Sequence, residues 1–351
     1  MPALPTTSRM GVRYCTFRYG NHHPVTRRRA LFMAGVALAV THRLSRGQGV
    51  STLRRVGVLL TSSEATSGHL YTAFVQAMND RGWAEGRNIQ YLVVSARGDV
   101  ERLDALAKEL IVNKVEVIVA STSAATLAAQ RATKTVPIVM VAVSNAIDSG
   151  FVASLAKPAG NITGVSNQRE EALQKVISIL HEILPGARRI AVLLNQRNPS
   201  YEAMWAAAES ACAALDLVAL RVVASGREQL NAAVAEIIRQ RSQAVVVVPD
   251  PVLLNERASL QQLMQAARLP VAYGLREHVT AGGLLSYATD LTANYRSAAT
   301  YVDRILKGAR PADLPVEQPT KYELVINLRS AKALGITIPQ SMLLRADALI
   351  Q

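Results

Sequence analysis

Polar side chains that could hold a small molecule follow the predicted strands of this chain, at the points where the strands end. The clearest group is Ser121-Thr122-Ser123, which lies between an apolar run at 115–120 and a helical pattern at 122–132. Three hydroxyls beside the unpaired N–H groups of a helix N-terminus can bind a carboxylate or another anion. Ser and Thr also cap helices at this position without any ligand, so the residues alone leave both interpretations open.

Other candidate ligand-binding residues occupy equivalent places, because ligands of open α/β sheets bind beyond the carboxyl ends of the strands. Asp250 follows the apolar run VVVV and Pro249, where its carboxylate could pair with a ligand amine or cap the next helix. Tyr273 and Tyr287 end or follow strands and could contact a ligand ring, or else only pack in the wall of a cleft. The remaining candidates are Ser62, Ser144, Asn145 and Asn195.

Motifs of common enzymes are missing from the sequence. There is no G-x-G-x-x-G after the first strand, no Walker A motif, no H-E-x-x-H and no G-x-S-x-G. The histidines outside the first fifty residues, at 69, 181 and 278, show no metal-ligand spacing. We therefore predict no catalytic residue, no metal and no cofactor, while an enzyme on a doubly wound fold stays open as a weaker alternative.

Alternating strands and helices must position these side chains. From Arg54 onward, short apolar runs rich in Val and Ile alternate with helical patterns, which is typical of βαβ units and a parallel sheet. This alternation of strands and helices starts with VGVLL at 56–60 and starts again with RIAVLL at 189–194. The sequence therefore predicts an α/β protein with two Rossmann-like lobes, each a parallel sheet covered by helices on both faces.

The first fifty residues have the layout of an export signal. Arg27-Arg28-Arg29 precedes ALFMAGVALAV at 30–40, an apolar run that is too short to span a bilayer and suits a signal-peptide core. Residues 28–32 also resemble a twin-arginine signal, so export by that route or by a Sec signal is predicted. The alternative is a disordered basic tail on a cytosolic protein.

The positive charge is concentrated in the same segment. Residues 1–50 hold eight arginines and no acidic residue, and without these eight charges the net charge of +13 falls to +5 for residues 51–351. The remaining excess forms no basic run with interleaved aromatics, so nucleic-acid binding is not predicted. Of the two cysteines, Cys15 lies in this segment and Cys212 in an apolar helical stretch. Removal of the segment would leave one thiol, which forms no intramolecular disulfide.

The segment Leu314–Arg345 carries a family resemblance. Alternation over 322–327 predicts a strand, a short helix follows at 329–334, and Gly335 stands where a C-cap glycine belongs. The sequence of this segment resembles the C-terminal signature of the ABC transporter substrate-binding family, whose members have the type I periplasmic binding protein fold. It reads LPVEQPTKYELVINLRSAKALGITIPQSMLLR. The resemblance runs from about Arg54 to the end of the chain.

This resemblance implies a three-stranded hinge between the lobes, with crossings near Gly164, Tyr287 and Pro319. It implies a signal segment at 1–50, lobe 1 at 54–163 plus 288–319, and lobe 2 at 164–287 plus 320–351. The loop that matches Ser121–Ser123 lies in the interlobe cleft of family members. Asn145 replaces the acid of a Thr-Asp-Pro-like turn, which weakens any ammonium contact there.

The function implied is the solute-binding component of an ABC importer. A monomer in the periplasm would bind an amino acid or related carboxylate between its lobes and present it to a membrane permease. Several family members are linked to aromatic amino acids. A periplasmic protein that senses its ligand and signals to a receptor would have the same lobes, so sensing stays open as the main alternative.

Overall fold

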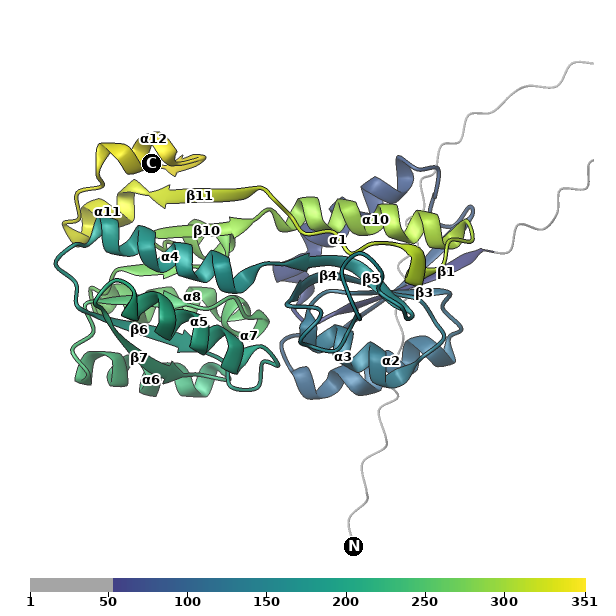
Figure 1. The fold of residues 1–351 in the computed structure, drawn as a ribbon, viewed down its shortest axis with the longest axis horizontal. Coiled ribbons are helices and arrows are strands. Elements are labelled where there is room, and N and C mark those ends of the chain that lie inside the picture. The colour runs from purple at the N-terminus through teal and green to yellow at the C-terminus, as the bar shows by residue number, and fades with distance from the viewer. Residues whose placement is uncertain (1–52) are drawn as a thin grey trace, which may run out of the picture. The chain divides into compact units, whose positions relative to one another are not determined.

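The computed structural model describes residues 53–351, and the predicted export signal at 1–50 lies outside them. The described residues form two α/β lobes, each built around one β-sheet (Figure 1). We refer to the part built on the sheet nearer the start of the chain as lobe 1, and to the other as lobe 2.

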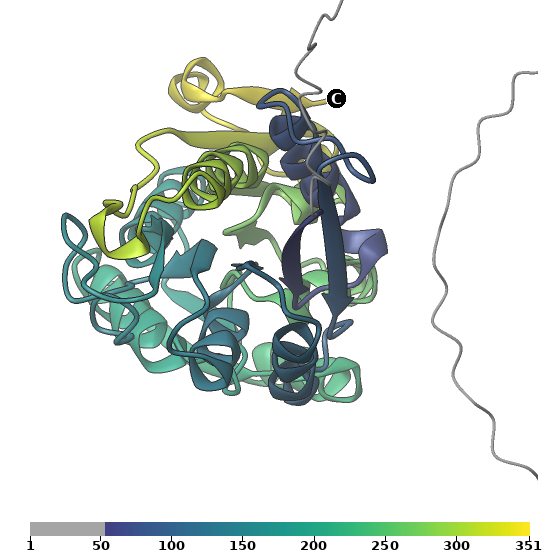
Figure 2. The same cartoon turned by 90° about the vertical axis from the view of Figure 1, so that its right-hand side faces the viewer.

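The sheet of lobe 1 has five parallel strands in the order β2-β1-β3-β4-β5. The strands are β1 (Arg54–Leu60), β2 (Ile89–Ser95), β3 (Val117–Ala120), β4 (Ile138–Ser144) and β5 (Ile162–Asn167). The helical elements are α1 (Glu64–Asn79), η1 (Val100–Arg102), α2 (Leu103–Val112), α3 (Ser123–Ala132), α10 (Leu291–Leu306) and η2 (Pro311–Asp313). Helices α1 and α10 cover one face of the sheet, and α2 and α3 cover the other (Figures 1 and 2). Because both faces are covered, every residue of β3 and β4 is buried, and apart from Ser144 at the end of β4 these strands are continuous apolar runs in the sequence.

The sheet of lobe 2 has seven strands in the order β12-β11-β10-β9-β8-β6-β7. They are β6 (Arg189–Leu194), β7 (Val218–Val223), β8 (Ala244–Val247), β9 (Val271–Tyr273), β10 (Leu285–Thr289), β11 (Tyr322–Asn327) and β12 (Ala348–Ile350). Its helices are α4 (Arg169–Ile183), α5 (Tyr201–Ala213), α6 (Arg227–Arg239), α7 (Pro251–Asn255), α8 (Arg257–Ala266), α9 (Arg276–Thr280), α11 (Leu328–Leu334) and α12 (Gln340–Arg345). The predicted α/β class with two sheet-based lobes is confirmed.

One strand departs from the predicted parallel arrangement, because β11 runs antiparallel to β10. The chain leaves lobe 2 at the end of β10 to form α10 in lobe 1, and it enters lobe 2 again along β11 (Figure 1). Two neighbouring strands that lead out of and into the same lobe must run in opposite directions. The third connection follows β5 and leads into α4.

Gly164, where one crossing was predicted, lies inside β5 just before this third connection. Its φ is +129°, and an added Cβ would lie 2.1 Å from the Met140 carbonyl oxygen of β4. Only glycine fits such a close approach of two backbones. Tyr287 lies within β10 and Pro319 shortly before β11, and the exact boundaries predicted for the lobes remain a prediction.

Local sequence features determine where several helices begin and end. Helix α7 begins at Pro251, because Asp250 caps it and proline suits the first helical position. Gly335 adopts φ +71° at the end of α11, as predicted for a C-cap glycine.

Candidate functional site

A cavity lies between the two lobes, at the edge where the strands of each sheet end. It encloses about 920 Å³ of space between atoms, including part that is open to solvent. Seven of the ten predicted site residues line it, namely Ser62, Ser121, Thr122, Ser123, Ser144, Asn195 and Asp250. Polar residues that the sequence analysis did not select also line it, namely Thr66, Ser67, Arg169, Arg197, Asn198, Ser200 and Tyr295.

The three hydroxyl side chains of the predicted anion site, Ser121, Thr122 and Ser123, lie at the N-terminus of α3. Thr122 caps the helix by accepting from the Ala125 N–H at 3.2 Å, and its Oγ1 lies 2.7 Å from Oγ1 of Thr61. Ser121 Oγ accepts from the Thr61 N–H at 3.0 Å, and Ser123 Oγ accepts from the Ser144 N–H at 3.3 Å. A hydroxyl that accepts from a backbone N–H still has its own O–H to donate. Ser121 and Ser123 can therefore donate to an anion in the cavity while Thr122 holds the helix end.

Asp250 of lobe 2 lines the same cavity as these hydroxyls. It lies three residues after the end of β8 and is 3% exposed. Its Oδ1 accepts from the N–H groups of Val252 and Leu253, at 2.8 and 3.2 Å, and from Asn195 Nδ2 at 3.1 Å. Its Oδ2 accepts from Asn198 Nδ2 at 2.8 Å, which is the one hydrogen bond to this oxygen within residues 53–351. Burial raises the pKa of this carboxyl, and the four hydrogen bonds oppose the rise. Asp250 can therefore cap a helix and contact a ligand amine at the same time. It caps α7 through Oδ1 and keeps one acceptor position on Oδ2 for a ligand donor.

Arg169 is the charged residue that sequence reasoning missed. It is the first residue of α4, directly after the connection that leaves β5, and its side chain lines the cavity. Nη2 donates to the Ala142 carbonyl of lobe 1 at 3.0 Å, and Nη1 donates to the Pro249 carbonyl of lobe 2 at 3.4 Å. Burial lowers the pKa of this guanidinium. A cation placed immediately after a predicted crossing strand was the signal that could have identified it.

Three predicted site residues lie away from this cavity. Asn145 has φ +42°, and its side chain hydrogen-bonds to Asp148 within the turn that follows β4. Tyr273 is 1% exposed, and its hydroxyl donates to Gln261 Oε1 at 2.9 Å inside lobe 2. Tyr287 lines a second, smaller cavity of about 390 Å³ at the connections between the lobes. Arg169, Pro249, Leu275 and Leu291 line both cavities, so the two spaces are neighbours.

Polar contacts join the lobes around the rim of the main cavity. They are Arg197 with Glu101 at 3.3 Å, Arg257 with Thr66 at 3.4 Å, the Ser63 N–H with Asn255 Oδ1 at 3.4 Å, and His69 with Glu277 at 3.7 Å. The partners in each pair come from different lobes. The structure therefore has its lobes drawn together over the cavity.

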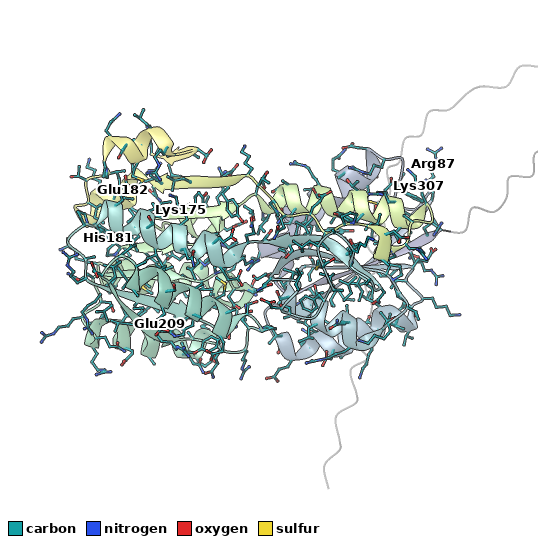
Figure 3. All side chains as sticks on the ribbon, in the orientation of Figure 1. Arg87, Lys175, His181, Glu182, Glu209 and Lys307 are labelled. Carbon is teal, nitrogen blue, oxygen red and sulfur yellow. The ribbon has the colours of Figure 1, made fainter. Side chains whose placement is uncertain are left out.

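Other kinds of site were sought in the same part of the chain. Residues 53–351 contain no group of three or more His, Cys, Asp or Glu that could hold a metal ion. None of the helices described for these residues has the length and apolar character needed to cross a bilayer. His181 lies on α4 at the end remote from the connection to lobe 1 (Figure 3).

Two α/β lobes that meet over a cavity are the architecture of the type I periplasmic binding protein fold. The family model described as "ABC transporter substrate binding protein" matches residues 55–350, and the chain belongs to this family. The resemblance found in the C-terminal sequence is thereby confirmed.

Individual relatives agree with this assignment. A protein named "Tyrosine-binding protein" from Clostridioides difficile (strain R20291) is 23% identical over 263 residues, which is 75% of each chain. An ABC domain from Streptococcus pneumoniae, solved in complex with L-Trp, superposes with a TM-score of 0.80 at 23% identity and covers 85% of this chain and 100% of its own. A conserved domain protein from Vibrio cholerae has a TM-score of 0.80 at 24% identity and covers 84% of this chain and 99% of its own. These two structures show the fold.

Proposed function

We propose that this protein binds an amino acid or a related small carboxylate reversibly between its lobes and delivers it to the membrane permease of an ABC importer. The observation that carries the proposal is the interlobe cavity, which is lined by Ser121 and Ser123 of lobe 1 and by Asp250 of lobe 2. Hydroxyls at a helix N-terminus suit a ligand carboxylate, and a buried Asp with a free acceptor position suits a ligand ammonium group. The tyrosine and tryptophan relatives support an amino acid as the ligand class.

The rest of the cavity wall provides for the hydrocarbon part of such a ligand. Leu70 and Val100 from lobe 1 and Met204 and Leu254 from lobe 2 line the same space. Binding sites for small molecules are typically apolar with a few well-placed polar groups. An amino acid would thus have its charged end between the hydroxyls and Asp250, and its side chain against these residues.

The mode of action follows from contacts with both lobes. A ligand that touches lobe 1 and lobe 2 together favours the arrangement in which the lobes are drawn together. We propose that this arrangement is recognised by the permease and that the ligand leaves chemically unchanged. We further propose that residues 1–50 direct export to the periplasm, in keeping with the usual site of action of this family.

A ligand screen with purified protein tests the proposal. The panel contains L-tyrosine, L-tryptophan, the other common amino acids, their amides and small carboxylates, and thermal unfolding is the measurement. A ligand present at about a hundred times its dissociation constant should add roughly 2.7 kcal/mol to the free energy of unfolding. The bound compound should be recovered unaltered by mass spectrometry. No stabilisation by any amino acid or carboxylate, or conversion of the bound compound, would refute the proposed function.

Two variants test the assigned site. Thr122→Ala and Asp250→Ala should each weaken binding of the identified compound. Thr122→Ala removes the cap that holds the end of α3 between Ser121 and Ser123, and Asp250→Ala removes the carboxylate acceptor. Thr133→Ala is the matched control, since Thr133 lies at the opposite end of α3 and also accepts from backbone N–H groups, at 3.1 and 3.0 Å. Thr122→Ala and Thr133→Ala should each lower the free energy of unfolding by about 1 kcal/mol. Only Thr122→Ala should change the dissociation constant, and equal affinity in both variants would contradict the site.

A further inference from the structure

We propose that Arg169 is the charged partner of the ligand's anionic group, and that it couples binding of that group to closure of the two lobes. The inference rests on the proposed function, because it concerns the ligand of the same cavity. It assigns to the ligand a full negative charge that must lie against the first turn of α4.

The first argument is the lack of an ionic partner for Arg169. A guanidinium has five N–H donors, and the two hydrogen bonds of Arg169 are both to backbone carbonyls. No carboxylate within residues 53–351 lies within 4.0 Å of it. Glu170 is its neighbour in sequence and makes no such contact, and Asp250 is already held by four donors. The side chain therefore lines the cavity with a charge and with donors that remain available.

The second argument is energetic. Removal of a cation from water is costly, and burial lowers the pKa of Arg169 although the charges of Glu170 and Asp250 oppose this shift. A bound carboxylate would offset this cost and could accept two parallel hydrogen bonds from the guanidinium. Among ligands of similar size, one that carries a carboxylate should therefore bind much more tightly than one in which it is replaced by a neutral group.

The third argument concerns the two carbonyls. Ala142 belongs to β4 of lobe 1, and Pro249 follows β8 of lobe 2, so Arg169 bridges the lobes. It can donate to both carbonyls only when the lobes lie as they do in this structure. Ala142 also lies two residues before Ser144, and the Ser144 N–H donates to Oγ of Ser123 in the predicted anion site. An anion held by Ser123 and Arg169 would fix the bridging position of the guanidinium and so stabilise the drawn-together lobes.

Arg197 offers a matched comparison. It is another arginine that lines the cavity, but it already forms an ion pair with Glu101 at 3.3 Å. Its side chain is 56% exposed, so its charge is solvated as well as paired. Loss of Arg197 should therefore have little effect on recognition of an anion within the cavity.

The experiment compares acids with their amides. Binding of L-tyrosine, L-tryptophan, tyrosinamide and tryptophanamide is measured by calorimetry for the wild type, Arg169→Met, Arg169→Lys and Arg197→Met. For an amino acid that binds, we expect a preference of about a hundredfold for the acid over its amide in the wild type and in Arg197→Met. Arg169→Met should remove most of this preference by weakening the acid alone, and Arg169→Lys should retain part of it. An unchanged preference in Arg169→Met would overturn the inference.

A second measurement separates failure of this inference from failure of the proposed function. Thermal unfolding is followed in sodium acetate and in sodium chloride of equal ionic strength, which requires no knowledge of the ligand. Acetate should stabilise the wild type and Arg197→Met more than chloride does, and this difference should vanish in Arg169→Met. If no amino acid binds but acetate still acts through Arg169, the proposed function fails and the anion site stands. If acetate acts equally in all variants, the anion site is refuted.

Discussion

His278 provides a test of how this fold responds to acid. It lies on α9, is 2% exposed, and stacks on Tyr273 with ring centroids 4.5 Å apart. Within residues 53–351, neither of its ring nitrogens has a hydrogen-bond partner of good geometry. Burial lowers the pKa of His278 from its ordinary value of 6.5 to about 3, the nearby Leu253 carbonyl opposes this shift, and Arg257 adds to it. The folded protein therefore holds this imidazole neutral well below the pH at which the unfolded chain protonates it.

The sign of the effect follows from this difference. Well above pH 6.5 neither state is protonated at His278, so its contribution to stability is constant. Between pH 6.5 and pH 3 only the unfolded state takes up the proton, so the free energy of unfolding falls as the pH falls. At 1.36 kcal/mol for each pKa unit, the loss from this residue between pH 7 and pH 5 is about 2 kcal/mol. The value depends mainly on the unfolded state, since the folded protein takes up almost no proton at pH 5.

Denaturant unfolding at pH 7 and pH 5 measures this loss, and His278→Phe isolates the part that comes from the imidazole. Phenylalanine preserves the stacked ring and leaves no buried nitrogen, so the stability at pH 7 should change little. The decrease between pH 7 and pH 5 should be smaller in His278→Phe than in the wild type by about 2 kcal/mol. His69→Gln, which alters a half-exposed histidine on α1, should keep the wild-type decrease because His278 stays buried. Equal decreases in the wild type and in His278→Phe would show that burial of His278 does not perturb its titration.

Two further predictions concern the rim and the core. In Gly98→Ala, a Cβ would lie 2.5 Å from Asn255 Nδ2 of the other lobe, at a residue whose φ is +90°, so we expect a loss of stability of about 1 kcal/mol and weaker ligand binding. Adding Asn255→Ala should restore binding but not stability, and calorimetry that finds no recovery would exclude the steric explanation. The Cys212 thiol is fully buried in α5, and burial raises its pKa to about 11, so a thiol reagent at pH 8 should modify Cys212 only after denaturation. Peptide mapping that detects modification of Cys212 in the folded protein at the denatured rate would contradict the packing described for α5.

The sequence was sufficient for those parts of the fold that depend on local patterns. Strands β3 and β4 could be predicted because covering a parallel sheet on both faces requires unbroken apolar residues, and their residues are all buried. Gly335 could be predicted because the left-handed conformation at a helix end favours glycine. The hydroxyls of residues 121–123 and Asp250 could be proposed as cavity residues because strand ends of α/β sheets meet at one edge.

Other features depend on contacts between distant segments. The sequence places Arg169 after a predicted crossing strand, but it does not show what the side chain contacts, since its partners Ala142 and Pro249 lie 27 and 80 residues away. Tyr273 ends a strand of only three residues, in which the alternation of faces decides whether a side chain enters the core. It points into the same core as Val271, on the side of the sheet covered by α8 and α9. A tyrosine one residue earlier, at position 272, would have packed on the opposite face of the sheet. Composition alone does not distinguish these two positions.

The strengths of the interlobe contacts indicate what determines closure. The contacts at the rim are long, and the ion pair of Arg197 with Glu101 joins side chains that are 56% and 75% exposed. Exposed ion pairs contribute at most about 1 kcal/mol, so the rim alone provides little free energy to keep the lobes together. Two groups inside the cavity can contribute more free energy. Among residues 53–351, Arg169 has no ion-pair partner and Asp250 keeps a free acceptor position. A zwitterion that supplies both missing partners would stabilise the drawn-together lobes far more than the rim does, whereas a compound that satisfies only one of them would occupy the cavity with much weaker closure. Affinity and closure should therefore change together across the ligand panel, because the same two side chains govern both.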